Sequence, residues 1–107
     1  MSAAGACAEL KRAIRAWFVS VGAPLSFESA TSRAWASITF AGERHRLVLR
    51  LPGPGAQAAA DAFLDGLADR EFSLRDHILA DIEATDMARD VDGEVRLTLE
   101  ALTVEDA

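Results

Sequence analysis

The first apolar pattern along the chain has the period of an α-helix. From Gly5 to Val21 the large apolar side chains recur every three or four residues, and the charged side chains fall between them. Gly22 follows directly and Pro24 comes soon after, and both residue types commonly end a helix. The pattern therefore predicts an amphipathic helix from about Gly5 to Val21, whose apolar stripe consists of Leu10, Ile14, Trp17, Phe18 and Val21.

The next pattern has a period of two, which is typical of β-strands. Apolar and polar side chains alternate through residues 34–51, on both sides of Gly42-Glu43. A two-residue turn with glycine in first place would join the two halves as a β-hairpin. In that register Ile38 faces Leu47, and the apolar side chains of both strands share one face. Because a slip by one residue would scatter them, the pattern predicts a hairpin with this turn.

A second helix is predicted after the Pro/Gly cluster "LPGPG" at residues 51–55. The cluster interrupts the sheet and provides a short connection. From Ala56 to Arg70 the apolar side chains again follow the helical period, while three aspartates point the other way. The expected apolar stripe consists of Ala56, Ala60, Phe63, Leu64 and Leu67.

Residues 73–86 are compatible with both a helix and a strand. A capping-box pattern from Ser73 to Asp76 and a high content of Ala, Asp and Glu favour a helix. Alternation between residues 77 and 85 favours a strand. Local propensity is weak evidence, so the decision depends on the rest of the chain.

A repeat in the sequence favours the strand. The segment "RLVLRL" at residues 46–51 returns as "RLTLEA" at residues 96–101. "WASI" at residues 35–38 and "LADI" at residues 79–82 precede these two segments in a similar way. A helical pattern comes before each pair, so the order helix, strand, strand occurs twice.

The repeat also predicts that the ambiguous segment is part of a second hairpin. It predicts a strand over residues 77–85 that pairs with residues 94–102, with a loop over residues 86–93 between them. In the register of the first hairpin, Ile82 would lie opposite Leu97.

Together these elements give an α+β fold with the order αββαββ. Two helices would cover one face of a four-stranded, mainly antiparallel sheet in a two-layer domain. A chain of 107 residues can form one core, so residues 1–107 are expected to be a single domain. The order of the strands across the sheet stays open. The expected core is Leu10, Ile14, Phe18, Ile38, Phe40, Leu47, Leu49, Phe63, Leu67, Ile82, Leu97 and Leu99.

The sheet face without helices is where we expect function. In the predicted register Trp35 lies on this face opposite Arg50, among aliphatic side chains, arginines and carboxylates. A face that meets only water needs no tryptophan, and exposed apolar patches usually form an interface or bind a ligand. Alternatively, the C-terminal tail or a loop covers the patch, or Trp35 only stacks on Arg50. The interface candidates are Trp35, Val48, Arg50, Leu79 and Leu102.

The charge balance argues against two classes of partner. The chain has a net charge of -6, whereas binding to nucleic acid or to an anionic membrane needs a concentrated positive surface. The basic cluster Arg44-His45-Arg46 is too small to change this expectation, and His45 fits the rim of the core. No segment approaches the roughly 20 apolar residues of a membrane span. We therefore expect neither nucleic acid nor a membrane as partner.

The single cysteine bears on the compartment and on catalysis. Cys7 has no partner for an internal disulfide, which favours the cytoplasm. A catalytic dyad of Cys7 with His45 or His77 has no support, because nothing near Cys7 in the sequence would activate its thiol.

A metal site at His77, Asp81 and Glu83 is also not expected. On a strand the first two residues would lie about 13 Å apart, too far to share one ion. On a helix they would be neighbours, but two ligands do not make a site. The chain has no phosphate-binding or hydrolase motif either. We therefore predict no catalytic, cofactor-binding or metal-binding residues and no cofactor.

The sequence favours one function over a second. The first is a non-enzymatic binding or assembly module that forms a homodimer through the uncovered sheet face. The alternative is a small-molecule-binding domain or minor enzyme, with a pocket between sheet and helices or at a dimer interface.

Overall fold

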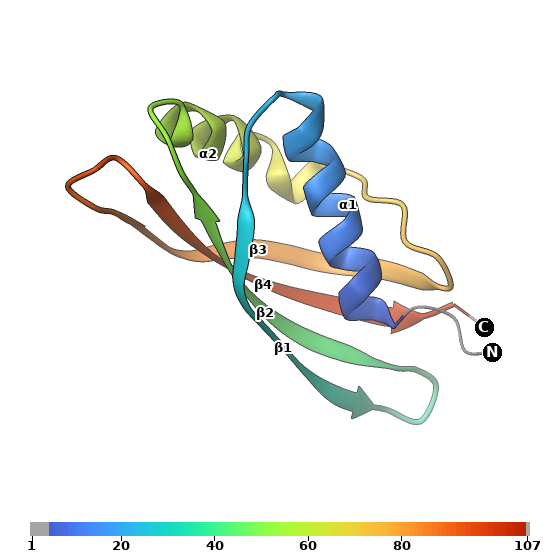
Figure 1. Ribbon diagram of the computed structural model, residues 1–107. Coiled ribbons are helices and arrows are strands. Elements are labelled where there is room, and N and C mark those ends of the chain that lie inside the picture. Colours follow the sequence, from blue (N-terminus) through green and yellow to red (C-terminus); the bar gives the residue numbers. More distant parts are fainter. Residues whose placement is uncertain (1–4, 107) are drawn as a thin grey trace.

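The chain forms an α+β fold with the predicted order of elements (Figure 1). The computed structural model describes residues 5–106. Its elements are α1 (Ala6–Ser20), β1 (Ser26–Ala36), β2 (Ala41–Leu51), α2 (Ala56–Leu64), the short 3-10 helix η1 (Leu67–Asp69), β3 (His77–Arg89) and β4 (Val95–Glu105). The sheet is antiparallel, with the strand order β1-β2-β4-β3. The strand order, which the sequence left open, places β2 and β4 at the centre.

The helix α1 ends where its sequence predicts. Gly22 has a φ of 72°, which glycine adopts without strain, and the N–H of Ala23 donates to the carbonyl of Phe18 at 2.9 Å. Val21 follows the last helical residue and is half exposed, so it does not continue the apolar stripe. The rest of the stripe faces the core, as predicted.

The helix α2 is shorter than predicted because the chain turns after Leu64. Gly66 has a φ of 73°, which breaks the helical path, and η1 follows in place of further α-helical turns. The guanidinium of Arg70 donates to the carbonyls of Phe63 and Asp65, the latter at 2.9 Å. These bonds satisfy carbonyl groups that the end of the helix leaves without partners.

The first hairpin turns four residues earlier than predicted. The N–H of Ser37 donates to the carbonyl of Phe40 at 2.7 Å, and the N–H of Phe40 donates to the Ser37 hydroxyl at 3.1 Å. A serine side chain that binds the backbone in this way stabilises a turn. Gly42 therefore lies inside β2, and the prediction of a turn at Gly42-Glu43 is wrong.

This turn changes the register of the hairpin and two members of the expected core. Leu47 pairs with Ala30, not with Ile38. Ile38 and Phe40 belong to the turn, where their relative exposures are 106% and 58%. Both were wrongly assigned to the core because the apolar alternation before residue 41 belongs to the turn and to the last residues of β1.

The second hairpin is confirmed as a hairpin, with a different register. Residues 77–89 form a strand, so the loop expected over residues 86–93 is reduced to a tight turn. The carboxylate of Asp90 closes this turn by accepting the backbone N–H groups of Asp92 and Glu94, at 2.9 and 3.0 Å. Because β3 is longer than predicted, Ile82 pairs with Ala101 and not with Leu97.

The sequence repeat corresponds to an approximate two-fold symmetry of the fold. In the two similar segments, Val48 and Thr98 occupy the same position. In the sheet these two residues are direct partners across β2 and β4, and Leu47 and Leu49 pair with Leu99 and Leu97. The two similar segments of β2 and β4 are therefore related by an approximate two-fold axis through the Val48–Thr98 pair.

The core unites both helices with one face of the sheet. The odd-numbered side chains of β2 and β4 pack in one buried cluster with the apolar stripes of α1 and α2. All residues of the expected core except Ile38 and Phe40 are buried. At its centre Phe63 contacts Phe18 and Trp17, with ring centroids 4.9 and 5.1 Å apart. The even-numbered side chains of β2 and β4 must then point to the opposite side of the sheet.

Candidate functional site

The side of the sheet opposite the core is called the open face below. Residues that pair directly across neighbouring strands point to the same side, so the even-numbered positions of β2 and β4 identify their neighbours on β1 and β3. The open face consists of Ser26, Ser29, Thr31, Arg33 and Trp35 on β1, Gly42, Arg44, Arg46, Val48 and Arg50 on β2, Arg96, Thr98, Glu100, Leu102 and Val104 on β4, and Ile78, Asp81, Glu83, Asp86 and Ala88 on β3.

The register places the interface candidates Trp35, Val48, Arg50 and Leu102 on the open face, but not Leu79. Leu79 pairs with Thr103 and is partly buried against the core cluster. The register shifts at residue 80, and such a bulge moves the following side chains to the other side of the strand. The neighbouring Ile78, which sequence analysis missed, lies on the open face and is 51% exposed.

Trp35 lies opposite a glycine, not opposite Arg50 as predicted. Its partner is Gly42, while Arg50 pairs with Ser26 at the other end of the hairpin. A Cβ atom on Gly42 would lie only 1.9 Å from the carbonyl oxygen of Thr103. Trp35 is partly buried, and its indole N–H is buried without a hydrogen-bond acceptor in the described part of the chain. Stacking on Arg50 therefore does not explain this tryptophan.

Like charges lie directly opposite each other at two places on the open face. Arg33 pairs with Arg44 across β1 and β2. Glu83 pairs with Glu100 across β3 and β4. All four residues are exposed, and like charges in directly opposed positions destabilise a sheet. Neither pair has an oppositely charged group within ion-pair distance in residues 5–106.

These pairs divide the open face into a basic and an acidic half. Arg46 lies on β2 beside the first pair, and Asp81 lies on β3 beside the second. We call Arg33, Arg44 and Arg46 the basic group, and Asp81, Glu83 and Glu100 the acidic group. Arg46 and Glu100 are direct partners across the centre of the sheet, yet their side chains form no ion pair with each other.

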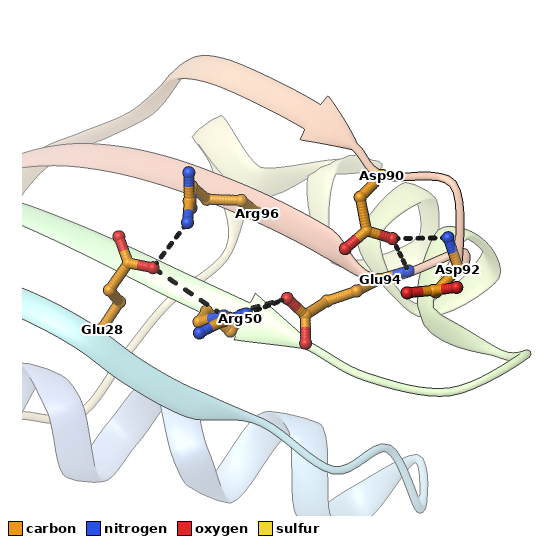
Figure 2. Close-up of polar contacts among 6 residues, drawn as sticks. All are labelled: Glu28, Arg50, Asp90, Asp92, Glu94 and Arg96. Atoms are coloured by element: carbon orange, nitrogen blue, oxygen red, sulfur yellow. Dashed lines mark hydrogen bonds and ion pairs between the residues drawn. The ribbon is translucent and has the colours of Figure 1, made fainter.

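A third pair of like charges is neutralised within the chain (Figure 2). Arg50 and Arg96 are direct partners across β2 and β4. The Glu28 carboxylate lies 2.8 Å from the Arg96 guanidinium and 3.8 Å from that of Arg50. Glu94 accepts a hydrogen bond from Nε of Arg50 at 2.9 Å and thereby raises the pKa of Arg50. This end of the open face therefore carries its own counter-charges, unlike the basic and acidic groups.

His45 belongs to the core side of the sheet. Its Nδ1 lies 2.7 Å from the Ser32 hydroxyl and its Nε2 lies 2.8 Å from the Thr103 hydroxyl. Burial lowers the pKa of His45 below its usual value of 6.5. Both ring nitrogens are thus engaged by hydroxyl groups, which fits a structural role for this histidine.

The other residues considered for chemistry lie in separate surroundings. Cys7 is partly buried against the core cluster, and Nδ1 of His77 lies 2.8 Å from the carbonyl of Arg75. Asp81 and Glu83 lie farther along β3, on the open face. Residues 5–106 contain no group of three His, Cys, Asp or Glu side chains placed to hold a metal ion.

An apolar cavity of about 430 Å³ lies between the end of α1 and the start of α2. It is lined by the connections that follow α1 and β2 and by one side of α2. All lining residues are Val, Leu, Ala, Gly or Pro, so no polar side chain projects into it. It is separate from the open face.

Comparison of the chain with known proteins gives no match. No protein-family model matches it, and no characterised protein or solved structure is significantly similar to it. No helix in residues 5–106 combines the length and apolarity needed to cross a membrane.

Proposed function

We propose that this protein is a non-enzymatic assembly module that forms a homodimer through its open face. The observation that carries the proposal is the pair of un-neutralised groups, one basic and one acidic, on the same exposed surface. Each group destabilises the isolated chain, because like charges lie side by side. A second copy offers the matching opposite charge for both groups at once, as a self-complementary interface requires.

The apolar residues of the open face support the same proposal. Trp35 lies at one end of the face with Val104 and the exposed Ile78 in the same cross-strand row. Tryptophan is enriched among the residues that contribute most to binding at protein interfaces. A cytoplasmic location is part of the proposal and is supported by Cys7 as the single cysteine.

The mass of the protein in solution tests this function. Sedimentation equilibrium at up to about 100 μM protein should give the mass of a dimer. Trp35→Ala should weaken dimerisation by about 30-fold or more, because truncation of an interface tryptophan costs on the order of 2 kcal/mol. The far-UV circular dichroism of this variant should stay that of the parent, since Trp17 and not Trp35 packs on Phe63.

A matched control and a second variant separate the interface from the fold. Val19→Ala removes an exposed apolar side chain from α1, away from the open face, and should leave dimerisation unchanged. Ile78→Asp places a charge on the open face at an exposed position and should also weaken the dimer. A parent that stays monomeric, or a dimer that tolerates both Trp35→Ala and Ile78→Asp, would refute the proposal.

The apolar cavity supports the alternative, a small-molecule-binding domain or minor enzyme. Its volume of about 430 Å³ falls within the range of ligand pockets. Such pockets usually contain a few polar side chains that orient the ligand, and this cavity offers none, so a ligand would have to be apolar. Binding of an apolar fluorescent probe that Ala59→Phe abolishes would favour this alternative.

A further inference from the structure

We propose that the two-fold axis of the dimer runs parallel to the strands, between β2 and β4, so that each basic group covers the acidic group of the second copy. This inference rests on the proposed function, since it describes how the open faces meet. Two copies can face each other only if the axis lies in the plane between their sheets. Its two limiting directions in this plane are along the strands and across them.

The two orientations bring different halves of the open face together. An axis along the strands exchanges the two edges of the sheet, so that β1 and β2 of one copy lie over β3 and β4 of the second. An axis across the strands keeps each half over the same half of the second copy. The second arrangement would stack the basic group on itself and the acidic group on itself. Electrostatics therefore selects the axis along the strands.

The cross-strand rows of the sheet match under this axis. One row reads Thr31, Arg46, Glu100 and Glu83 from β1 to β3. The two-fold axis reverses the order of this row in the second copy. Arg46 therefore lies above Glu100 of the second copy, and Glu100 lies above Arg46 of the second copy. These two residues do not pair with each other within one chain, so both are free to pair across the interface.

The neighbouring rows are complementary as well. The row that ends the sheet reads Trp35, Gly42, Val104 and Ile78. Its reversal places Trp35 on Ile78 of the second copy, and Val104 over the glycine, which has no side chain to obstruct it. In the row between, Arg33 comes to lie over Asp81 of the second copy. Apolar side chains thus meet in the end row, and Arg33 and Arg46 meet carboxylates, whereas Arg44 and Glu83 lie over Leu102 and Thr31 of the second copy.

The row of Arg50 and Arg96 explains the ion pairs at the far end of the face. In this row the axis along the strands stacks arginine on arginine, which would oppose dimerisation. It is also the row in which Glu28 and Glu94 neutralise both arginines from within the chain (Figure 2). Glu28 and Glu94 therefore neutralise the arginines in the row where this dimer would otherwise bring like charges together.

A charge exchange between two variants tests the axis. Arg46→Glu and Glu100→Arg should each weaken dimerisation at least about tenfold at low salt, because each variant alone places like charges together twice. An equal mixture of the two should recover the affinity of the parent to within about threefold. In the mixed dimer the two introduced charges meet across the interface, and so do the two native ones. Sedimentation velocity with one variant labelled measures the mixed species directly.

The controls separate the axis from the dimer and from the fold. The double variant R46E/E100R restores both contacts and should dimerise like the parent. Glu71→Arg reverses an exposed charge away from the open face and should have no effect. Circular dichroism of each variant should match that of the parent.

The outcomes distinguish a wrong axis from a wrong function. A dimer in which the single variants weaken but the mixture does not recover would overturn the axis and leave the open-face dimer intact. Preferential pairing of Arg46→Glu with the parent would do the same, because an axis across the strands brings Arg46 next to its own copy. A monomeric parent would refute the proposed function itself.

Discussion

Gly42 provides a sharp test of the central strand pairing. A Cβ atom at this position would lie 1.9 Å from the carbonyl oxygen of Thr103, 2.9 Å from its carbonyl carbon and 3.0 Å from Cα of Val104. All three are backbone atoms of β4, which cannot rotate away as a flexible side chain would. Gly42→Ala must therefore separate β2 from β4 at this end of the sheet.

The magnitude follows from the atoms that have to move. Overpacking of a well-packed site usually costs 1–3 kcal/mol, and displacement of backbone belongs at the upper limit, so we expect a loss of about 3 kcal/mol. For a chain of this size that loss corresponds to a decrease in Tm of roughly 10–15 °C. Urea unfolding at one fixed protein concentration measures it, because dimerisation would make the stability depend on concentration.

Gly55→Ala is the matched control. Gly55 has an ordinary φ of -90°, and a Cβ atom there would meet nothing within 4 Å. It precedes α2 as the N-cap residue, so its replacement by alanine should cost less than about 1 kcal/mol. If Gly42→Ala were no more destabilising than this control, the register between β2 and β4 at this end of the sheet would be wrong.

Two further predictions concern the core side of the sheet. Because burial lowers the pKa of His45, the unfolded chain binds a proton below about pH 6.5 that the folded chain does not. Its contribution to the free energy of unfolding is therefore complete above that pH and decreases as the pH falls, and His45→Asn should flatten this dependence in urea titrations between about pH 7.5 and 5. An unchanged pH dependence would contradict the assignment. Phe63→Ala should cost about 3–5 kcal/mol, because the ring is fully buried against Phe18 and Trp17. Ile38→Ala should cost less than about 0.5 kcal/mol in the same measurement, and similar losses for the two variants would place Ile38 back in the core.

The helices and the centre of the sheet could be predicted because their patterns are complete in the sequence. The stripe of α1 repeats at the helical period up to Gly22, and the leucines of "RLVLRL" recur at every second position. In both cases the side that faces the core is buried over most of the element, so the apolar positions follow the period of the element. The repeat of "RLVLRL" also identified β3 as a strand against its local helical propensity.

The register of both hairpins could not be predicted because β1 and β3 lack such a pattern. No residue of β1 is fully buried, and Ile82 is the single buried residue of β3. The first register depends on the Ser37 turn and the second on the bulges of β3, which are local hydrogen-bond features without a hydrophobic signal.

The candidate face could be predicted only in part for the same reason. Trp35, Val48 and Leu102 lie on the predicted side of the sheet, because alternation decides the side of a strand within a regular segment, although Val48 is buried there. The opposition of Arg33 with Arg44 and of Glu83 with Glu100 depends on strand pairing, which joins residues far apart in the chain. Alternation along one strand contains no information of that kind.

The bulges have a consequence for how the molecule can aggregate. β1 and β3 are the edges of the sheet, and both carry register shifts, one in β1 and two in β3, whereas the central pairing of β2 with β4 has none. A regular edge presents a row of unpaired N–H and C=O groups on which a strand of another molecule can grow, as in amyloid fibrils. Each bulge bends and twists its strand, which interrupts that row. The two edges are therefore poor templates for addition of further strands. The same bulges that made the register unpredictable from the sequence thus protect the protein against fibril formation.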